Sequence, residues 1–492
     1  MSHDLQAAWA ASEIAYLFNH KQDIITSGLG TPGEWSFYTS REGKRIWPIA
    51  DGVIVAENPT ASLKIALEYK RPNEGLHGIL TALGQSLAYI EKGYNGSVII
   101  IPKEYDSHRL PGEHLSRVLQ RTAPDMPVSI YTYSEPDTTA TTPFRDKLNC
   151  IREISLSANI VRSEVADSYV KTLWVHLREG SSDPDAFFRY CQIAKRVSGS
   201  DAEYRYPALP PELSSAIDRL SPGSDPYKYL SYSIGESLLD VTWRNFWFTY
   251  IVNDDTLALY ECNNGHYSVN ASPTKIKKSD GTGFKMMFVG RSNSPKNKAV
   301  DSLNNRTFTE DESWEFYAKN IRNRAHSYRE DIDSGLAGIG FLADDGRPTD
   351  LGYRFVDACE RTGNPNAGIA LEIFGSSILQ QGQLGAFLYY IYKLSEKRFS
   401  DNPLDFTTQK ANGSYSFNPT DYKTWLEDCF RNELYIIRKV SERGGRSRLP
   451  FQAEMAILRN LGYVKGFRIG VGLEINWPKV QESMGYFKLL QQ

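Results

Sequence analysis

The stretch IALEYKRP, residues 65–72, decides how the first part of this chain folds. Its apolar and β-branched residues predict a β-strand, and a proline ends it. Glu68 and Lys70 are two positions apart, and side chains at i and i+2 of a strand project from the same face. The strand therefore places a carboxylate beside an ammonium, next to apolar residues.

The sequence around this strand alternates between strand and helix patterns. Short runs rich in β-branched and aromatic residues predict strands at 34–40, 45–55, 62–72, 96–102 and 128–134. Apolar residues at helical spacing predict helices at 5–20, 76–92 and 112–123, the second ending near Gly93. The order is helix, three strands, helix, strand, helix, strand, so an α/β domain is predicted over residues 1–150.

A second carboxylate comes from the neighbouring strand. Asp51 lies on the strand predicted at 45–55, and a hairpin could bring it to Glu68 and Lys70 at one end of the sheet. Two carboxylates on adjacent strands can hold Mg²⁺ through oxygen ligands and leave positions for phosphate oxygens and water. The lysine could orient or deprotonate the attacking water and offset charge on the phosphate. This arrangement suits the hydrolysis of a phosphodiester.

These residues resemble the motif of the PD-(D/E)xK nuclease superfamily, which comprises restriction endonucleases and related DNA nucleases. The match lies in IADGVIV and LEYK, where Asp51 falls on the metal-binding aspartate, Glu68 on the second acidic ligand and Lys70 on the lysine. Ala50 stands where the motif has a proline. The resemblance covers about the first 135 residues and implies a mixed central sheet flanked by helices, with Mg²⁺ held by Asp51 and Glu68.

Two further features agree with the resemblance. Glu13 matches a glutamate on the first helix of many members, which implies a third metal ligand, and Gln85 with Tyr89 matches a Q-xxx-Y element, which implies contacts with DNA. Ordinary roles compete with each assignment. A solvated Glu–Lys pair needs no function, Glu13 could be a solvated helix carboxylate, and Gln85 and Tyr89, one turn apart, could serve packing and capping.

The remainder of the chain is predicted to be a mainly helical α+β region that recognises DNA. Residues 151–250 show helical patterns at 161–180, 184–197 and 225–248, and residues 251–310 suggest a small β-element with a basic loop. Within 311–365, GFLADDGRPTDLGYRF resembles the hairpin and Thr-capped helix of a winged-helix domain, although a structural helix-turn unit is an equal rival. Residues 366–492 form a C-terminal α+β region.

Basic residues in two segments are candidates for phosphate contacts. They are Lys277 and Lys278 in the first segment and Arg443, Arg446 and Arg448 in the second. A solvated loop explains the lysines at least as well, and a flexible linker explains the arginines too.

Composition excludes several classes of protein. The chain has 492 residues, enough for several domains, and its 41% hydrophobic and 23% charged residues are a globular balance. Five scattered cysteines form no zinc pair, and no phosphate loop, dinucleotide fingerprint or long apolar window is present. A cytoplasmic protein that uses no ATP and contacts no membrane is therefore expected. The net charge of −3 decides nothing about a nucleic-acid partner.

The resemblance and the large appendage together predict a type II restriction endonuclease of a phage-defence system. It would cleave double-stranded DNA with Mg²⁺ at a specific sequence, reading bases or their modification, as a homodimer or a transient pair on DNA. A defence-effector nuclease, switched on by a small molecule or partner and cutting without sequence specificity, is the alternative. A non-catalytic DNA-binding or scaffold protein that keeps the fold is a third.

Overall fold

The structure is a computed structural model of the whole chain. It describes residues 3–22, 35–42, 47–59, 61–105, 108–154, 156, 169–170, 173–175, 177, 183–199, 214–215, 217–218, 222–223, 235, 237–251, 259–269, 295–401, 406–409, 415–417, 422–437, 442–443, 446–447, 451–468 and 472–490. The chain divides into two compact units. Unit 1 comprises residues 1–176 and 376–492, and unit 2 comprises residues 177–375.

Unit 1 is built on a seven-stranded mixed sheet with the order β6-β5-β4-β3-β2-β1-β7. Its strands are β1 (Ser36–Glu42), β2 (Gly52–Glu57), β3 (Ser62–Tyr69), β4 (Gly96–Pro102), β5 (Val128–Tyr133), β6 (Leu148–Arg152) and β7 (Tyr169–Val170). The pairs β3–β4 and β4–β5 are parallel, and every other pair is antiparallel. The expected α/β class with a mixed sheet flanked by helices is thus confirmed, whereas the nuclease core remains a prediction.

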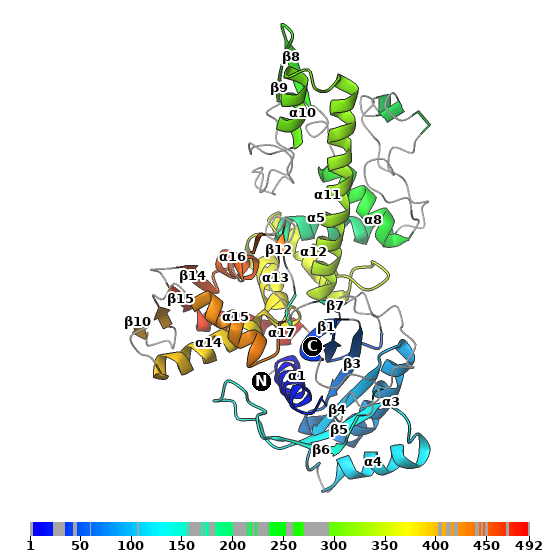
Figure 1. The fold of residues 1–492 in the computed structure, drawn as a ribbon, viewed down its shortest axis with the longest axis vertical. Helices are drawn as coiled ribbons and strands as arrows, with labels where there is room; N and C mark the ends of the chain where they lie inside the picture. Colours follow the sequence, from blue (N-terminus) through cyan, green and yellow to red (C-terminus); the bar gives the residue numbers. More distant parts are fainter. Residues whose placement is uncertain are drawn as a thin grey trace. The chain divides into compact units, whose positions relative to one another are not determined.

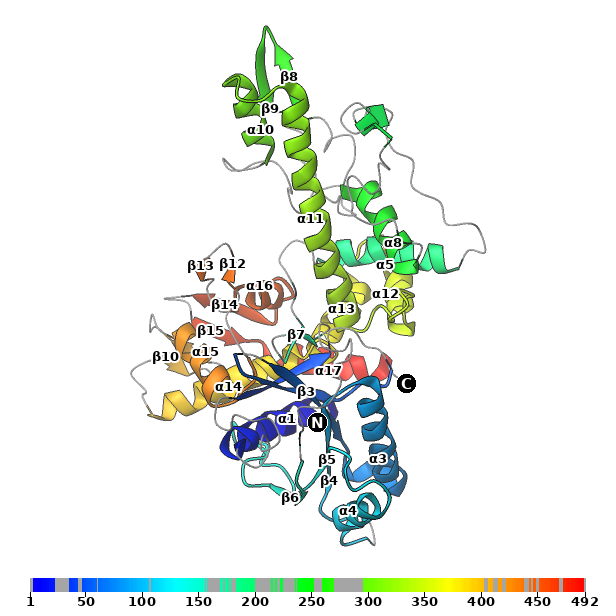
Figure 2. The same ribbon diagram turned by 45° about the vertical axis from the view of Figure 1, so that its right-hand side comes forward.

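Helices cover both faces of this sheet (Figure 1 and Figure 2). One face holds α1 (His3–His20), and the other holds α3 (Gly75–Lys92) and α4 (Pro111–Thr122). Helix α3 ends where Gly93 adopts φ 107°, a left-handed conformation that glycine reaches without steric cost, and its N–H bonds to the carbonyls of Tyr89 and Ile90.

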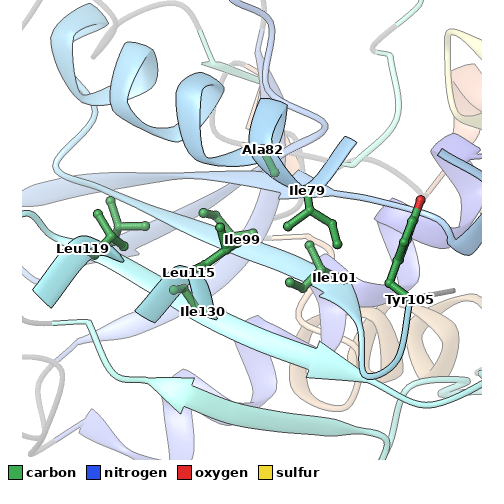
Figure 3. Packing of buried hydrophobic residues seen from close by; sticks show 9 residues of the cluster. Ile79, Ala82, Ile99, Ile101, Tyr105, Leu115, Leu119 and Ile130 are labelled. Atoms are coloured by element: carbon green, nitrogen blue, oxygen red, sulfur yellow. The ribbon is translucent and has the colours of Figure 1, made fainter. Parts of the chain in front are cut away.

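An apolar core joins α3 and α4 to strands β4 and β5 (Figure 3). Ile99 and Ile101 are alternate residues of β4, so they point to the same face and meet Ile79 of α3 and Leu115 of α4. Both isoleucines are fully buried. The register pairs Glu68 of β3 with Ile99, so the Glu68 carboxylate emerges on this helix-covered face at the end of the sheet.

Where the structure describes it, the C-terminal segment of unit 1 contains four helices and three hairpins. Its helices are α14 (Leu384–Asp401), α15 (Tyr422–Asn432), α16 (Gln452–Asn460) and α17 (Trp477–Leu490), and its hairpins are β10–β11 (Phe406–Gln409, Tyr415–Phe417), β12–β13 (Glu442–Arg443, Arg446–Ser447) and β14–β15 (Val464–Arg468, Gly472–Ile475). It packs on the N-terminal segment, because the Trp9 ring of α1 lies 4.8 Å from Tyr389 of α14, and the Thr39 N–H donates to the Tyr435 carbonyl at 2.7 Å.

Unit 2 is mainly helical. Its helices are α5 (Pro184–Ser198), α8 (Leu238–Phe246), η3 (Trp247–Ile251), α10 (Pro295–Asn304), α11 (Glu310–Gly338), α12 (Asp350–Thr362) and most of α13 (Gly368–Gln380). The hairpin of β8 (Tyr260–Asn263) and β9 (His266–Val269) turns at Asn264 and Gly265, both at positive φ, as an Asn-Gly hairpin turn requires. It packs against α10.

The predicted elements agree with the structure in several places and differ in others. Strand 96–102 and helix 184–197 are confirmed nearly to the residue, and Thr349 caps α12 by accepting from the Gly352 N–H at 3.1 Å. The helix predicted at 161–180 is wrong where the structure describes it, since residues 169–170 form β7 on the edge of β1. Pairing with an open sheet edge overrides the local helical pattern there. The winged-helix assignment remains a prediction.

None of the described helices combines the length and apolarity that a membrane span requires.

Candidate active site

Backbone pairing brings Asp51 to the end of β3. Strands β2 and β3 form an antiparallel hairpin in which Gly52, the first residue of β2, pairs with Leu67. Asp51 is predicted to lie on this strand, but it is the residue directly before the strand begins. Its N–H donates to the Leu67 carbonyl at 3.0 Å, and its carboxylate Oδ2 accepts from the Tyr69 N–H at 2.8 Å. Asp51 therefore lies across from the segment that carries Glu68 and Lys70.

Glu68 and Lys70 form the ion pair that their spacing predicts. Lys70 Nζ lies 2.5 Å from Glu68 Oε1, and Glu68 keeps only 1% of its side chain exposed. Lys70 follows the last residue of β3, where its N–H donates to the Ile100 carbonyl at 2.9 Å and its carbonyl accepts from the Tyr133 hydroxyl at 2.9 Å. These bonds to β4 and β5 fix the lysine backbone.

The Tyr89 hydroxyl of α3 connects the second carboxylate to the segment before Asp51. It lies within hydrogen-bonding distance of Glu68 Oε2 and 3.0 Å from the Ile49 carbonyl oxygen. Because a hydroxyl has one proton, Tyr89 cannot donate to both oxygens at once. Gln85, one turn earlier on α3, is half-buried, and its Oε1 has no hydrogen-bond partner among the described residues.

His3 of α1 also reaches this end of the sheet. Its Nε2 donates to the Tyr69 carbonyl at 2.9 Å and lies 3.7 Å from Asp51 Oδ2 and 3.9 Å from Glu74 Oε1. Burial alone would lower the pKa of His3, but the hydrogen bond to Asp4 and the charge of Asp51 raise it to about 9. The imidazole is thus a cation that partly offsets the carboxylates.

Burial and mutual repulsion shift the acids toward their neutral forms. Burial, and then the charge of Asp51, raise the pKa of Glu68 to about 7, and burial also raises the pKa of Asp51. Burial would lower the pKa of Lys70, but the charge and hydrogen bond of Glu68 raise it above its ordinary value. The site combines a protonated lysine with two carboxylates that gain from any added cation.

A cavity of about 90 Å³ within unit 1 opens beside Asp51. Ile49 and Ala50 line it from the segment before Asp51, and Arg41 of β1 lines it together with Gln381 and Gln383 between α13 and α14. Asp51 keeps 21% of its side chain exposed, and the structure gives its Oδ1 no hydrogen-bond partner among the described residues. That oxygen remains available to a ligand.

These donors fit a hard divalent cation in charge and chemistry. Asp51 and Glu68 offer carboxylate oxygens, which are the ligands that Mg²⁺ prefers, and a cation would relieve the repulsion that raises the Glu68 pKa. Within the described ranges, however, no group of three or more His, Cys, Asp or Glu side chains is arranged to hold a metal ion. Mg²⁺ at this site would therefore need water or phosphate oxygens as further ligands.

Glu13 is engaged elsewhere in unit 1. Arg145 Nε lies 3.1 and 3.0 Å from the two Glu13 oxygens, and the Arg145 guanidinium stacks 3.4 Å over the Tyr16 ring. Glu13 is only 3% exposed, and burial, the largest influence, raises its pKa. In this structure both of its oxygens therefore serve an ion pair, and its role as a metal ligand stays a prediction.

The basic candidates for DNA contacts fall outside the described residues or in a segment described by its backbone alone. Lys277, Lys278 and Arg448 lie outside the described residues. Arg443 and Arg446 pair across the β12–β13 hairpin, for which the structure describes the backbone only. Their contacts with DNA remain predictions.

Sequence patterns missed His3, Arg41 and Arg145. His3 contacts Asp51, 48 positions along the chain, and Arg145 contacts Glu13, 132 positions away. Only tertiary folding brings these residues together. Arg41 donates to the Gln381 carbonyl at 3.0 Å across 340 positions. Neither spacing nor periodicity carries a signal for such contacts.

Comparison with known proteins adds no family assignment. No protein-family model matches this chain, and no curated protein sequence matches it.

Proposed function

We propose that this protein is a Mg²⁺-dependent endonuclease that hydrolyses phosphodiester bonds in double-stranded DNA at a specific sequence. One observation carries the proposal. Asp51, Glu68 and Lys70 meet at one end of the β2–β3 hairpin, and Asp51 lines a cavity with one carboxylate oxygen open. This geometry supports a hydrolytic site for an anionic substrate more directly than it supports a structural ion pair.

The three residues have separate roles in the proposed reaction. Asp51 and Glu68 hold Mg²⁺, which when bound polarises the phosphate and lowers the pKa of a bound water. Because the pKa of Lys70 is raised, its ammonium orients the attacking water and offsets phosphate charge rather than acting as a free base. Tyr89 positions Glu68, and Tyr133 and the β4 backbone position Lys70.

Cleavage of phage DNA by the purified full-length chain tests the proposal. Unmethylated and methylated DNA are incubated with Mg²⁺ or with EDTA, beside Lys70→Ala. Removal of the ammonium is expected to slow cleavage by about 10²–10⁴-fold. Lys103→Ala is the matched control, because Lys103 is exposed and follows β4 as Lys70 follows β3, and it should change the rate less than about threefold.

The cleavage pattern separates the candidate functions. Discrete Mg²⁺-dependent fragments that disappear in Lys70→Ala support the sequence-specific enzyme, and unequal cutting of the two DNAs supports reading of modification. A smear favours the effector nuclease. Absence of cleavage under every condition, with and without cell extract as a source of activator, contradicts a nuclease.

A further inference from the structure

An unusually exposed tryptophan lies four residues before Asp51. Trp47 is 82% exposed, more than any other large hydrophobic residue in the described part of the chain, and is the one aromatic ring in that group. Tryptophans are highly buried on average because the indole ring contributes a large apolar surface. An indole this exposed has a flat apolar face on which a ligand can stack.

The backbone that carries Trp47 is held in place. Lys92 Nζ donates to the Pro48 carbonyl at 2.7 Å, and the Tyr89 hydroxyl lies 3.0 Å from the Ile49 carbonyl oxygen. Pro48 is buried, although Trp47 and Ile49 on either side of it are exposed. The indole is therefore presented on an anchored segment, so a ligand that stacks on it needs to order little of the protein.

The same segment leads directly into the candidate catalytic site. Ile49 lines the cavity beside Asp51, and the Tyr89 hydroxyl that holds Ile49 also contacts Glu68. A strand whose phosphate reaches Asp51 and whose backbone runs along this segment brings a neighbouring base past Ile49 to Trp47. A base attached to that phosphate is the flat, apolar-faced partner that an exposed indole stacks on.

From this geometry we propose that Trp47 is a stacking platform for an unpaired base next to the scissile phosphate. This inference rests on the proposed function and specifies its substrate class: DNA in which a base beside the cleaved bond has left the helical stack. Inside a paired duplex that base must first leave the stack, which opposes binding. Mismatched, bulged or single-stranded sites should accordingly bind better than fully paired ones.

Oligonucleotide binding to full-length protein in the Lys70→Ala background, with Mg²⁺ present, tests the platform. The probes are one fluorescein-labelled sequence as a single strand, as a duplex with a central single-base bulge, and as a paired duplex. Trp47→Ala is expected to weaken binding to the first two between about fivefold and 150-fold and to weaken paired duplex less. Trp47→Phe, which keeps a ring, should retain most of the affinity.

Controls separate stacking from folding. Leu110→Ala removes another exposed apolar side chain of unit 1, 58% exposed, and should leave all three affinities unchanged. Because Trp47 is mostly exposed, its loss should not lower the melting temperature. The protein has nine tryptophans, so the fluorescence quenched on binding is assigned to Trp47 by subtracting the Trp47→Phe signal.

The outcomes distinguish failure of the platform from failure of the proposed function. Cleavage by the wild type with equal affinities in Trp47→Ala and Leu110→Ala overturns the stacking platform and leaves the nuclease standing. A Trp47→Ala protein that changes its oligomeric state but keeps its preference for unpaired sites also overturns it, since the ring would then serve a protein interface. No cleavage and no binding by the wild type overturn both.

Discussion

Two clusters of charged side chains in this molecule look similar in composition but differ in the hydrogen bonds that their carboxylate oxygens accept. In unit 2, Asp333 accepts from the Tyr190 hydroxyl at 2.6 Å and from Arg329 Nε at 3.3 Å, while Asp240 accepts from Arg329 Nη1 at 2.7 Å and from Ser237. Each carboxylate oxygen has a donor. In unit 1, Asp51 lines a cavity and accepts a hydrogen bond at Oδ2, while its Oδ1 has no hydrogen-bond partner among the described residues.

This difference separates a structural network from a candidate site. In unit 2 the network is closed, which means that every carboxylate oxygen accepts a hydrogen bond from another member. These bonds compensate the desolvation of the charges, so removal of one member leaves the others unpaired and costs stability. Asp51 and Glu68 lie close together, and His3 and Lys70 offset their desolvation and repulsion only in part, so a bound cation would reduce that cost further. Burial and a perturbed pKa occur in both clusters, and so neither property alone identifies function.

Removal of the Asp51 charge from the candidate site should have the largest effect on activity. Asp51→Asn should lower Mg²⁺-dependent cleavage at least about 100-fold, because the proposed metal loses a ligand. The same change should leave the free energy of unfolding unchanged or raise it, since it removes a buried charge whose pKa is already raised. Cleavage rates and urea denaturation of the same preparations measure both effects. Full activity in this variant would place Asp51 with the structural carboxylates.

The pH dependence of stability gives the next largest effect. The pKa of Glu68 is about 7 when folded and 4.5 as its ordinary value, so the folded protein binds this proton more tightly than the unfolded chain. Its contribution, about 3 kcal/mol, is fully present below pH 4.5 and is lost as pH rises to 7. Urea denaturation in EDTA between pH 5 and 8 should show this decline.

Millimolar Mg²⁺ distinguishes the two clusters in that experiment. A cation at Asp51 and Glu68 should reduce the decline in the wild type, and Glu68→Gln should show neither the decline from this residue nor the response to Mg²⁺. The pKa of Asp333 is also raised, first by burial, so unit 2 contributes to the pH dependence with the same sign. That part should not respond to Mg²⁺. An equal Mg²⁺ response in Glu68→Gln would contradict a metal at this residue.

Loss of one hydrogen-bond acceptor in the closed network of unit 2 should lower the stability of the protein without changing its activity. Asp333→Asn replaces a carboxylate oxygen with an amide that faces Arg329 or Tyr190, and should cost about 1–3 kcal/mol of unfolding free energy. Cleavage per folded molecule should stay within about twofold of wild type. A selective loss of cleavage without destabilisation would mean that the network in unit 2 takes part in the reaction.

Sequence reasoning reached the candidate site through short-range geometry. The strand period puts Glu68 and Lys70 on one face, and a hairpin between adjacent strands brings Asp51 across from them, so spacing alone predicted the ion pair that the structure contains. The cavity beside Asp51 depends on contacts between segments far apart in the sequence, such as Arg41 with the Gln381 carbonyl across 340 positions. Periodicity contains no information about those contacts.

The same limit explains the errors in the fold. Strand β6 (Leu148–Arg152) has too little alternation to stand out, and β7 is two residues that pair with whatever edge the fold leaves open. The packing of residues 376–492 within unit 1 likewise rests on tertiary contacts, such as Ser12 Oγ donating to the Leu434 carbonyl across 422 positions. Long apolar strands and capped helices, by contrast, can be recognised from the local sequence.

Glu13 offers the smallest and most discriminating test, because the family resemblance and the geometry give it different roles. Both Glu13 oxygens accept from Arg145, as the carboxylate oxygens of unit 2 accept from their donors. Glu13→Gln should therefore lower the free energy of unfolding by about 1 kcal/mol and leave the Mg²⁺ concentration for half-maximal cleavage unchanged. Arg145→Met should destabilise the protein at least as much, because it leaves a buried carboxylate unpaired. If Glu13→Gln instead raises the Mg²⁺ requirement while Arg145→Met does not, Glu13 leaves Arg145 to bind the metal, and the closed pair is the resting state of a third ligand.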